Sequence, residues 1–328
     1  MKQEKTIKYK RAADGIYEID TYYIGRSNYT CCYLVEDNGE VAIVETNTNY
    51  AVPFILGTME QLGLDKKQVK YVILTHIHLD HAGGAGELMK NLPKAELVVH
   101  PRGRKHMIDP EKLIKSVKEV YGEAKYKELY GEIIPIPEER VITADDGDVL
   151  RLGGRELEVF DLRGHAKHHF SLLDKKTNSF FSGDNFGIGY PHFTFKTVRL
   201  VFPSTSPTQF EPDKAIETYE KIVDLKPSRV LLTHYGAITE LENAYAQLKA
   251  WIEFSIEIAE QRYNQGYRDK TLNDILCEDI WARFEKEIKG ARGSGLTAEE
   301  KELLAIDAEL NARGIAHYIH KINSRKDK

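Results

Sequence analysis

Four side chains that commonly bind metal ions lie within six residues, His76-Ile-His78-Leu-Asp80-His81. They follow an apolar run, Tyr71–Leu74, that is typical of a buried β-strand. Burying so many polar groups costs free energy unless partners satisfy them, and a divalent metal ion would satisfy them. Neutral imidazole and carboxylate are ligands that suit zinc, iron or manganese. The pattern therefore predicts a metal loop, residues 76–81, at the end of a strand.

Three other predicted strands are each followed by a candidate metal ligand. One such residue would be weak evidence, because a single histidine after a strand is usually packed or exposed. The same strand-then-ligand pattern at four places in one chain is strong evidence, since rigid scaffolds place reactive groups on the loops at a sheet edge. The three further candidates are His165, Asp184 and His234.

The composition is that of an ordinary soluble globular protein, with 328 residues, 41% hydrophobic and 30% charged. The chain contains no apolar run of about 18 residues, so we expect no membrane span. Its charged N-terminus lacks the apolar stretch of a secretory signal. The three cysteines, Cys31, Cys32 and Cys277, form no disulfide framework, and this favours a cytoplasmic protein.

The formal net charge of −5 bears on the partners of the chain. Proteins that bind nucleic acids need a basic face for the phosphates, so a nucleic-acid partner is disfavoured. We expect a small-molecule substrate instead. The charged side chains of residues 101–135 are expected to form a solvated helical face rather than a clamp on the substrate.

Turn and periodicity signals predict the order of the elements. Asn38-Gly39 between two apolar runs predicts a hairpin with a type I′ turn. Helical spacing predicts two long helices after residue 240, and the capping box Thr297–Glu300 predicts the start of a third, which Asn311–Gly314 is expected to end. The other predicted elements are a helix over 51–62, strands over 149–152 and 157–160, and a hairpin of 170–173 with 179–182.

On these motifs the chain resembles the metallo-β-lactamase superfamily, over roughly residues 15–240. The resemblance implies an α/β fold, the four-layer αββα metallo-β-lactamase sandwich. It implies a catalytic domain over residues 1–240, with a helical insertion at about 101–135. Residues 241–328 would form a helical C-terminal extension, which could shape the edge of the active site or form the interface of a homodimer.

The resemblance also implies roles for single residues. Asp80 is the candidate catalytic residue, because it could accept a proton from the attacking water. His169 falls where the family has a supporting histidine, and His168 stands where the family usually has glycine, so its role is open. Glu45 stands in the family's Asp-x-Gly turn, without the glycine, as a supporting acceptor or an ordinary strand-end acid. Two divalent ions, zinc first with iron or manganese as alternatives, would be held by His76, His78 and His165, by Asp80, His81 and His234, and by Asp184 as a bridge.

Asp184 indicates the branch, because β-lactamases of this fold tend to have Cys or Ser there. The resemblance is to glyoxalase II, lactonases and phosphodiesterases. It implies a hydrolase that uses a metal-bound hydroxide on a thioester, lactone or other ester-like bond. One alternative is a mono-iron oxidoreductase of the persulfide dioxygenase type, with His76, His165 and Asp184 around one iron. The other is phosphodiester hydrolysis.

The segment 186–208, which follows Asp184, is rich in aromatic residues. Ligand pockets are mostly apolar and aromatic, with a few polar groups. Tyr190, His192 and Phe193 are therefore predicted to line the substrate pocket. The alternative is that they pack against the helical extension.

Overall fold

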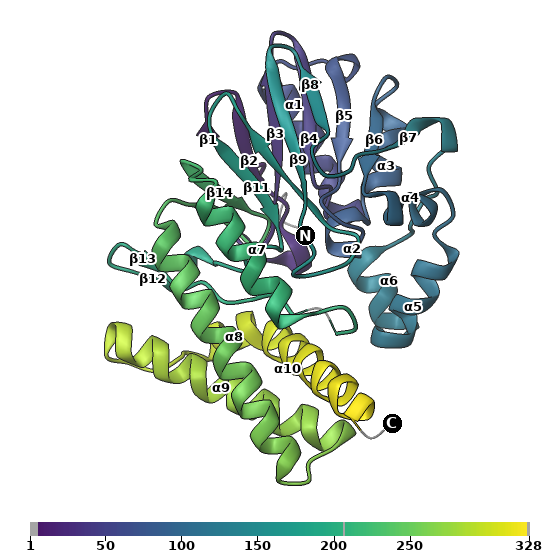
Figure 1. Ribbon diagram of the computed structural model, residues 1–328. Helices are drawn as coiled ribbons and strands as arrows, with labels where there is room; N and C mark the ends of the chain where they lie inside the picture. The colour runs from purple at the N-terminus through teal and green to yellow at the C-terminus, as the bar shows by residue number, and fades with distance from the viewer. Residues whose placement is uncertain (1–5, 206, 327–328) are drawn as a thin grey trace. The chain divides into compact units, whose positions relative to one another are not determined.

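The computed structural model describes residues 6–205 and 207–326, so the first five residues of the charged N-terminus lie outside the described part. The chain divides into two compact units (Figure 1). The first unit comprises the chain up to Asp161, with His168–Gly183 and Pro227–Thr239. The second comprises Leu162–Lys167, Asp184–Lys226 and the chain from Glu240 onward.

The first unit contains a seven-stranded sheet in which the strands follow one another in chain order. Strands β1 to β4 pair antiparallel, and β4 to β7 pair parallel. The β3–β4 hairpin turns at Asn38 and Gly39, whose φ angles of 49° and 80° confirm the predicted turn. The strands are β1 Tyr9–Ala13, β2 Ile16–Asp20, β3 Cys31–Asp37, β4 Glu40–Val44, β5 Val69–Ile73, β6 Glu96–Val99 and β7 Val141–Thr143.

A six-stranded sheet in the same unit has the order β15-β14-β11-β10-β9-β8. Its β10–β11 hairpin is the one predicted from the sequence, and β11 pairs parallel with β14. The parallel pairing places the ends of β11 and β14 at the same edge of the sheet, so Asp184 and His234 follow neighbouring strands. The strands are β8 Val149–Leu152, β9 Arg155–Asp161, β10 Phe170–Asp174, β11 Ser179–Gly183, β14 Arg229–Leu232 and β15 Gly236–Ile238.

Helices α1 and α3 of the first unit pack on the seven-stranded sheet. Ile55 of α1 and Leu88 of α3 are fully buried in one core cluster with Ile43 and Val72 of the strands. Helices α4 to α6 form the predicted insertion between β6 and β7. The helices are α1 Val52–Gln61, α2 Leu79–Ala82, α3 Ala85–Asn91, α4 Pro101–Ile108, α5 Glu111–Tyr121 and α6 Glu123–Tyr130, with short 3₁₀ turns η1 Tyr23–Gly25, η2 Asn49–Ala51, η3 Lys66–Gln68 and η4 Glu138–Arg140.

The second unit is built mainly from four helices around an aromatic core. Phe284 packs against Phe202 and Trp251, with ring centroids 5.0 and 4.7 Å away. This packing explains why each of the long helices has one apolar face. The elements are η5 Pro191–Phe193, β12 Thr194–Phe195, β13 Val198–Arg199, α7 Pro212–Asp224, α8 Leu241–Asn264, α9 Asp269–Arg292 and α10 Ala298–Lys326 (Figure 1).

The start of α10 was predicted correctly, but its end was not. The Glu300 amide donates to the Thr297 hydroxyl at 3.2 Å, and the Thr297 amide donates to the Glu300 carboxylate at 2.8 Å. The helix then continues through Gly314 to Lys326. A Cβ at Gly314 would lie 2.6 Å from the Thr205 carbonyl oxygen, so this glycine allows close packing inside the second unit rather than ending the helix.

The mixed α/β fold with a helical C-terminal region is confirmed. Both large sheets lie in the first unit, and α8, α9 and α10 make up the C-terminal region. Among the described residues, no helix combines the length and the apolar character that crossing a membrane would need.

Candidate metal centre

The metal loop changes from extended to helical backbone in its middle. Strand β5 ends at Ile73, and His78 still has extended angles, φ −62° and ψ 146°. Helix α2 begins at the next residue and is about one turn long, so Asp80 and His81 both lie within that turn. The predicted ligands therefore lie on two pieces of backbone. His76 and His78 come from the extended piece, and Asp80 and His81 come from the helix.

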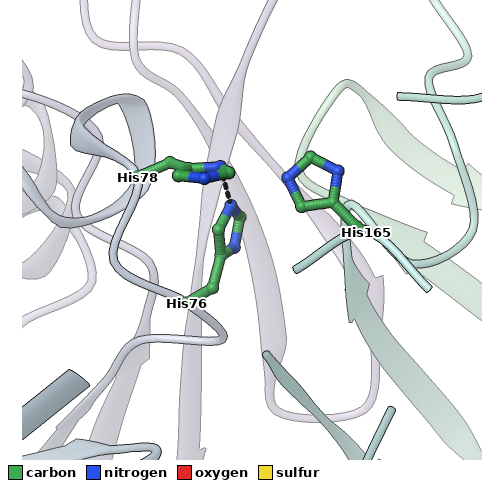
Figure 2. Close-up of side chains that lie close together, drawn as sticks. All are labelled: His76, His78 and His165. Carbon is green, nitrogen blue, oxygen red and sulfur yellow. Dashed lines mark hydrogen bonds between the residues drawn. The ribbon is translucent and has the colours of Figure 1, made fainter. Parts of the chain in front are cut away.

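His76 and His78 bring two ring nitrogens close together. His76 Nε2 lies 2.9 Å from His78 Nδ1 (Figure 2). The other nitrogen of His76, Nδ1, lies 3.1 Å from the hydroxyl of Thr75, and that hydroxyl donates to the Glu45 carboxylate. The Thr75 oxygen therefore accepts from His76 Nδ1–H, which leaves Nε2 as the atom able to bind a metal. Since Zn–N bonds are about 2.0–2.1 Å long, one ion could bind both nitrogens.

Asp80, His81 and His234 form a second group of candidate ligands within the first unit. One ligand atom from each lies within 4.8 Å of those of the other two. The Asp80 carboxylate lies 3.4 Å from His234 Nε2 and 3.8 Å from His81 Nε2. Both histidines are buried, and Asp80 is 24% exposed. Two imidazoles and one carboxylate are a donor set that fits zinc or iron, so the residues present fit a metal ion.

The turn Glu45-Thr46-Asn47 holds the backbone of the metal loop. Its Thr46 hydroxyl donates to the His81 carbonyl at 2.8 Å, and the Asn47 amide group donates to the Asp80 carbonyl at 2.8 Å. Glu45 and Asn47 have φ angles of 68° and 52°. Left-handed backbone costs roughly 1–2 kcal/mol in residues other than glycine, and Asn tolerates it best. Asn47 thus occupies the place of the family's glycine, in a strained turn that serves the site.

The buried carboxylate of Glu45 faces two parts of the site. One oxygen accepts from the Thr75 amide at 3.2 Å as well as from its hydroxyl. The other lies 3.4 Å from His81 Nδ1. A carboxylate there favours the tautomer with the proton on Nδ1, which leaves His81 Nε2 for a metal. These contacts favour the supporting role of Glu45 over that of an ordinary strand-end acid.

Two further histidines of the first unit lie beside His76 and His78. The His169 ring stacks on His76 with centroids 4.6 Å apart, as a supporting residue would. His168 is half-buried, and its ring lies 5.4 Å from that of His78.

The second unit contains His165 and Asp184, which lie close to each other. His165 Nε2 is 3.6 Å from the Asp184 carboxylate, and His165 Nδ1 is 2.9 Å from the Ser204 carbonyl oxygen. A carbonyl only accepts hydrogen bonds, so Nδ1 carries the proton and Nε2 is left to bind a metal. The Ser204 hydroxyl donates to Asp184 at 3.0 Å. Burial raises the pKa of Tyr219 above its ordinary value, and the nearby Asp184 carboxylate raises it further.

The predicted substrate residues also lie in the second unit. Tyr190 is fully buried, and its hydroxyl donates to Asp307 of α10 at 3.1 Å. Phe193 is buried as well, whereas His192 is exposed. The Tyr190 contact favours packing against the helical region, which was the alternative to a pocket role.

Several residues that matter here were not found from the sequence. Thr75 was signalled only by its position beside His76, and Ser204 by nothing in the sequence. A further group of possible ligands, His100, Asp145 and Asp161, also went unnoticed. His100 Nδ1 accepts from the Arg102 amide at 3.1 Å, so its proton lies on Nε2, 3.6 Å from Asp161. A protonated nitrogen cannot bind a metal, and this contact is better explained as a polar contact between a neutral imidazole and a carboxylate.

Comparison with known proteins agrees with this geometry. The sequence profile described as "Metallo-beta-lactamase superfamily" matches residues 28–234. The metallo-beta-lactamase fold-containing protein ST1585 of Sulfurisphaera tokodaii is 28% identical over 60% of this chain and 71% of its own length. The crystal structure of ST1585 superposes with a TM-score of 0.62, at 21% identity, over 92% of this chain and 98% of that one.

Two relatives carry names that describe an activity. A hydroxyacylglutathione hydrolase of Prochlorococcus marinus is 27% identical over 42% of this chain, and the match spans 45% of that protein. The human acyl-coenzyme A thioesterase MBLAC2 is 23% identical over 54% of this chain, and the match spans 65% of that protein. Both matches therefore cover less than two thirds of the relative's length.

Proposed function

Because this chain belongs to the metallo-β-lactamase superfamily, we propose that it is a hydrolase of thioester, lactone or other ester-like bonds that requires two divalent metal ions. The observation that carries the proposal is the Asp80, His81 and His234 group, which lies beside the His76–His78 pair in the first unit. One set of donors would serve a single ion. The presence of two sets favours two ions.

The residues divide between the two ions as the family resemblance implies. His76, His78 and His165 would hold one ion, Asp80, His81 and His234 would hold the other, and Asp184 would bridge them. When bound, two such ions lower the pKa of a water molecule to about 7 and polarise the bond to be cleaved. Zinc is the first candidate for both positions, with iron or manganese as alternatives.

The protein's own side chains orient these ligands and move the proton. Thr75 and Glu45 hold His76 and His81 in the tautomers that leave Nε2 available. Ser204 does the same for His165. Asp80, with its carboxylate 24% exposed, can accept a proton from the attacking water and release it to solvent. Asp80 is therefore the proposed catalytic residue.

The names of the relatives support thioesters as the first substrates to test. One relative is named as a hydrolase of hydroxyacylglutathione and another as a thioesterase of acyl-coenzyme A. The mono-iron alternative uses only His76, His165 and Asp184, and it would leave the Asp80, His81 and His234 group without a role. We also infer a cytoplasmic enzyme, because Cys31, Cys32 and Cys277 are free thiols in the structure.

Metal analysis and a substrate panel test the proposal together. The purified protein is analysed for its metals and then assayed with a thioester, a lactone and a phosphodiester. We expect two ions per chain, together with turnover of the thioester or the lactone. One iron per chain with oxygen uptake would support the dioxygenase alternative, and turnover of the phosphodiester alone would support a phosphodiesterase.

Replacement of the bridging residue tests the site directly. Asp184→Ala should lower kcat/KM by at least about 10²-fold and remove about one metal ion or more per chain, because one carboxylate serves both ions. Asp224→Ala, an exposed position on α7 of the same unit, is the matched control and should keep both metal and activity. Full metal content and full turnover in Asp184→Ala would show that Asp184 is not a ligand.

A further inference from the structure

One face of α10 carries buried polar residues in the interior of the helix. Asp307, Asn311 and Gly314 recur at the spacing of a single helix face, and the side chains of Asp307 and Asn311 are 7% and 5% exposed. Asparagine is a poor helix former, and a buried polar side chain needs hydrogen-bond partners. Asn311 was predicted to begin the end of this helix, but the helix continues to Lys326, so Asn311 has another role.

That role is to hold Thr205. The Asn311 side-chain oxygen accepts from the Thr205 amide at 2.8 Å. The Thr205 hydroxyl lies 2.9 Å from the same oxygen and 3.0 Å from the Asn311 carbonyl oxygen. Gly314 allows this close approach, because a Cβ there would lie 2.6 Å from the Thr205 carbonyl oxygen. The amide and the hydroxyl of Thr205, which is buried, are thus both held by one residue of α10.

The residue before Thr205 contacts both candidate ligands of the second unit. The Ser204 carbonyl oxygen lies 2.9 Å from His165 Nδ1, and the Ser204 hydroxyl donates to Asp184 at 3.0 Å. The Ser204 carbonyl and the Thr205 amide belong to one planar peptide unit. A hydrogen bond that fixes the Thr205 amide therefore fixes the direction of the Ser204 carbonyl, and through it the ring of His165.

The two hydrogen bonds of this peptide unit also polarise each other. In a trans peptide the N–H and the C=O point in opposite directions, so the contacts run from Asn311 through the peptide unit to His165. An acceptor at the N–H increases the negative charge on the carbonyl oxygen, which then accepts more strongly from His165 Nδ1–H. A stronger hydrogen bond at Nδ1 makes Nε2 of a metal-binding histidine a better ligand.

We propose that Asn311 is a positioning residue of the metal centre, which sets the orientation and the basicity of His165 through the peptide unit of Ser204 and Thr205. The inference rests on the proposed function in one respect, because it takes His165 and Asp184 as metal ligands. It gives the helical C-terminal region a role in the chemistry of the site, since α10 supports the ligands of its own unit.

A second amide side chain holds the same stretch of backbone and provides a matched control. Gln247 of α8 accepts from the Val201 amide at 3.0 Å and donates to the Arg199 carbonyl at 2.9 Å. Like Asn311, it comes from a long helix of the second unit. Gln247 holds Val201, however, rather than the peptide unit that faces His165. A purely structural role for Asn311 predicts the same behaviour for both residues.

Competition titration with a zinc chelator measures the effect on the full-length protein without turnover. In Asn311→Ala we expect the affinity for one of two zinc ions to fall about tenfold, the lower end of the range for residues that orient metal ligands, because Asn311 acts through a peptide unit. Gln247→Ala should bind both ions as tightly as the unaltered protein. If Asn311→Ala does not fold, Asn311→Ser replaces it, because the shorter side chain places no oxygen at the position of Oδ1.

Two conservative variants separate the peptide unit from packing. Asn311→Asp keeps an acceptor oxygen for the Thr205 amide, so zinc affinity should return to that of the unaltered protein. Thr205→Val removes the hydroxyl but keeps the amide that Asn311 holds. It should lower the free energy of unfolding, measured with denaturant, and leave zinc affinity unchanged.

The outcomes distinguish this inference from the proposed function. Zinc affinity in Asn311→Ala equal to that in Gln247→Ala would overturn the positioning role, and hydrolysis of a thioester or a lactone by the unaltered protein would leave the proposed function standing. Weaker zinc binding in Asn311→Ala alone, restored in Asn311→Asp, would support the positioning role. The same result in a protein that hydrolyses no thioester, lactone or other ester would reject the proposed function alone.

Discussion

The metal loop and the aromatic segment 186–208 both follow the end of a strand, yet they are held in different ways. The metal loop is fixed by hydrogen bonds from one turn, which reach the Thr75, Asp80 and His81 backbones. The aromatic side chains of residues 186–205 are held mainly by ring packing, as in the contact of Phe202 with Phe284, whereas Ser204 in the same stretch makes polar contacts with His165 and Asp184. Proximity to a candidate ligand is therefore a poor guide to role. Polar contacts mark the residues that serve the metal loop, whereas the buried aromatic residues form the core of the second unit.

Loss of the Glu45 charge would test whether polar contacts hold the metal loop, and it has the largest expected effect. Glu45→Gln places an amide where a carboxylate faces His81 Nδ1, so a donor would oppose a donor. We expect metal affinity or kcat/KM to fall about 10–100-fold, as for other residues that orient metal ligands. Titration of the metal-free protein with zinc, followed by assay, measures the effect.

The control for this variant lies on β4, the strand that Glu45 directly follows. Glu40 of β4 is 40% exposed and forms an ion pair with Lys70 at 3.1 Å. Glu40→Gln should leave metal affinity unchanged, since exposed ion pairs contribute little. If Glu45→Gln binds metal as tightly as Glu40→Gln and the unaltered protein, Glu45 is an ordinary strand-end acid.

Two glycines in long helices test the packing half of the comparison. Gly290 of α9 has open space around its Cβ position, whereas Gly314 of α10 faces the Thr205 carbonyl oxygen at 2.6 Å. Gly290→Ala should raise the free energy of unfolding by about 0.5–1 kcal/mol through helix propensity. Gly314→Ala should lower it by about 1–3 kcal/mol through overpacking. Denaturant unfolding measures both, and stabilisation by Gly314→Ala would mean that the contact with Thr205 is not tight.

The role of Gly314 shows the difference between features that can be predicted from the sequence and features that cannot. The metal loop, the Asn38-Gly39 hairpin and the capping box at Thr297 are local patterns, and the structure contains the loop, the hairpin and the box in those places. The end of α10 depends on Thr205, more than one hundred residues earlier in the chain, so Gly314 looked like a helix terminator.

The supporting residues of the site show the same limit. Thr75 and Ser204 orient His76 and His165 through single hydrogen bonds. A threonine and a serine have no distinctive spacing in a sequence, so only the three-dimensional contacts reveal them. The insertion has charged residues on an exposed face, as predicted, with an ion pair between Lys118 and Glu123 at 2.9 Å. Its opposite face was not predicted, because the packing of Leu113, Ile114 and Val117 against an apolar cluster that contains Leu79 depends on contacts distant in the sequence.

A small expected effect separates the packing role of Tyr190 from a role in the substrate pocket. Tyr190→Phe keeps the ring but removes the hydrogen bond to Asp307, so the free energy of unfolding should fall by about 1 kcal/mol. The kcat/KM of the folded protein and its metal content should not change, because the hydroxyl contacts α10. Tyr245→Phe removes an exposed hydrogen bond to Glu220 in the same unit and is the matched control, which should change neither stability nor kinetics. Loss of a hydrogen bond to a developing oxyanion typically lowers the rate about 10²–10³-fold. A fall of that size in Tyr190→Phe, with normal stability and metal content, would assign Tyr190 to the substrate pocket and remove the distinction between the polar metal loop and the packed aromatic segment.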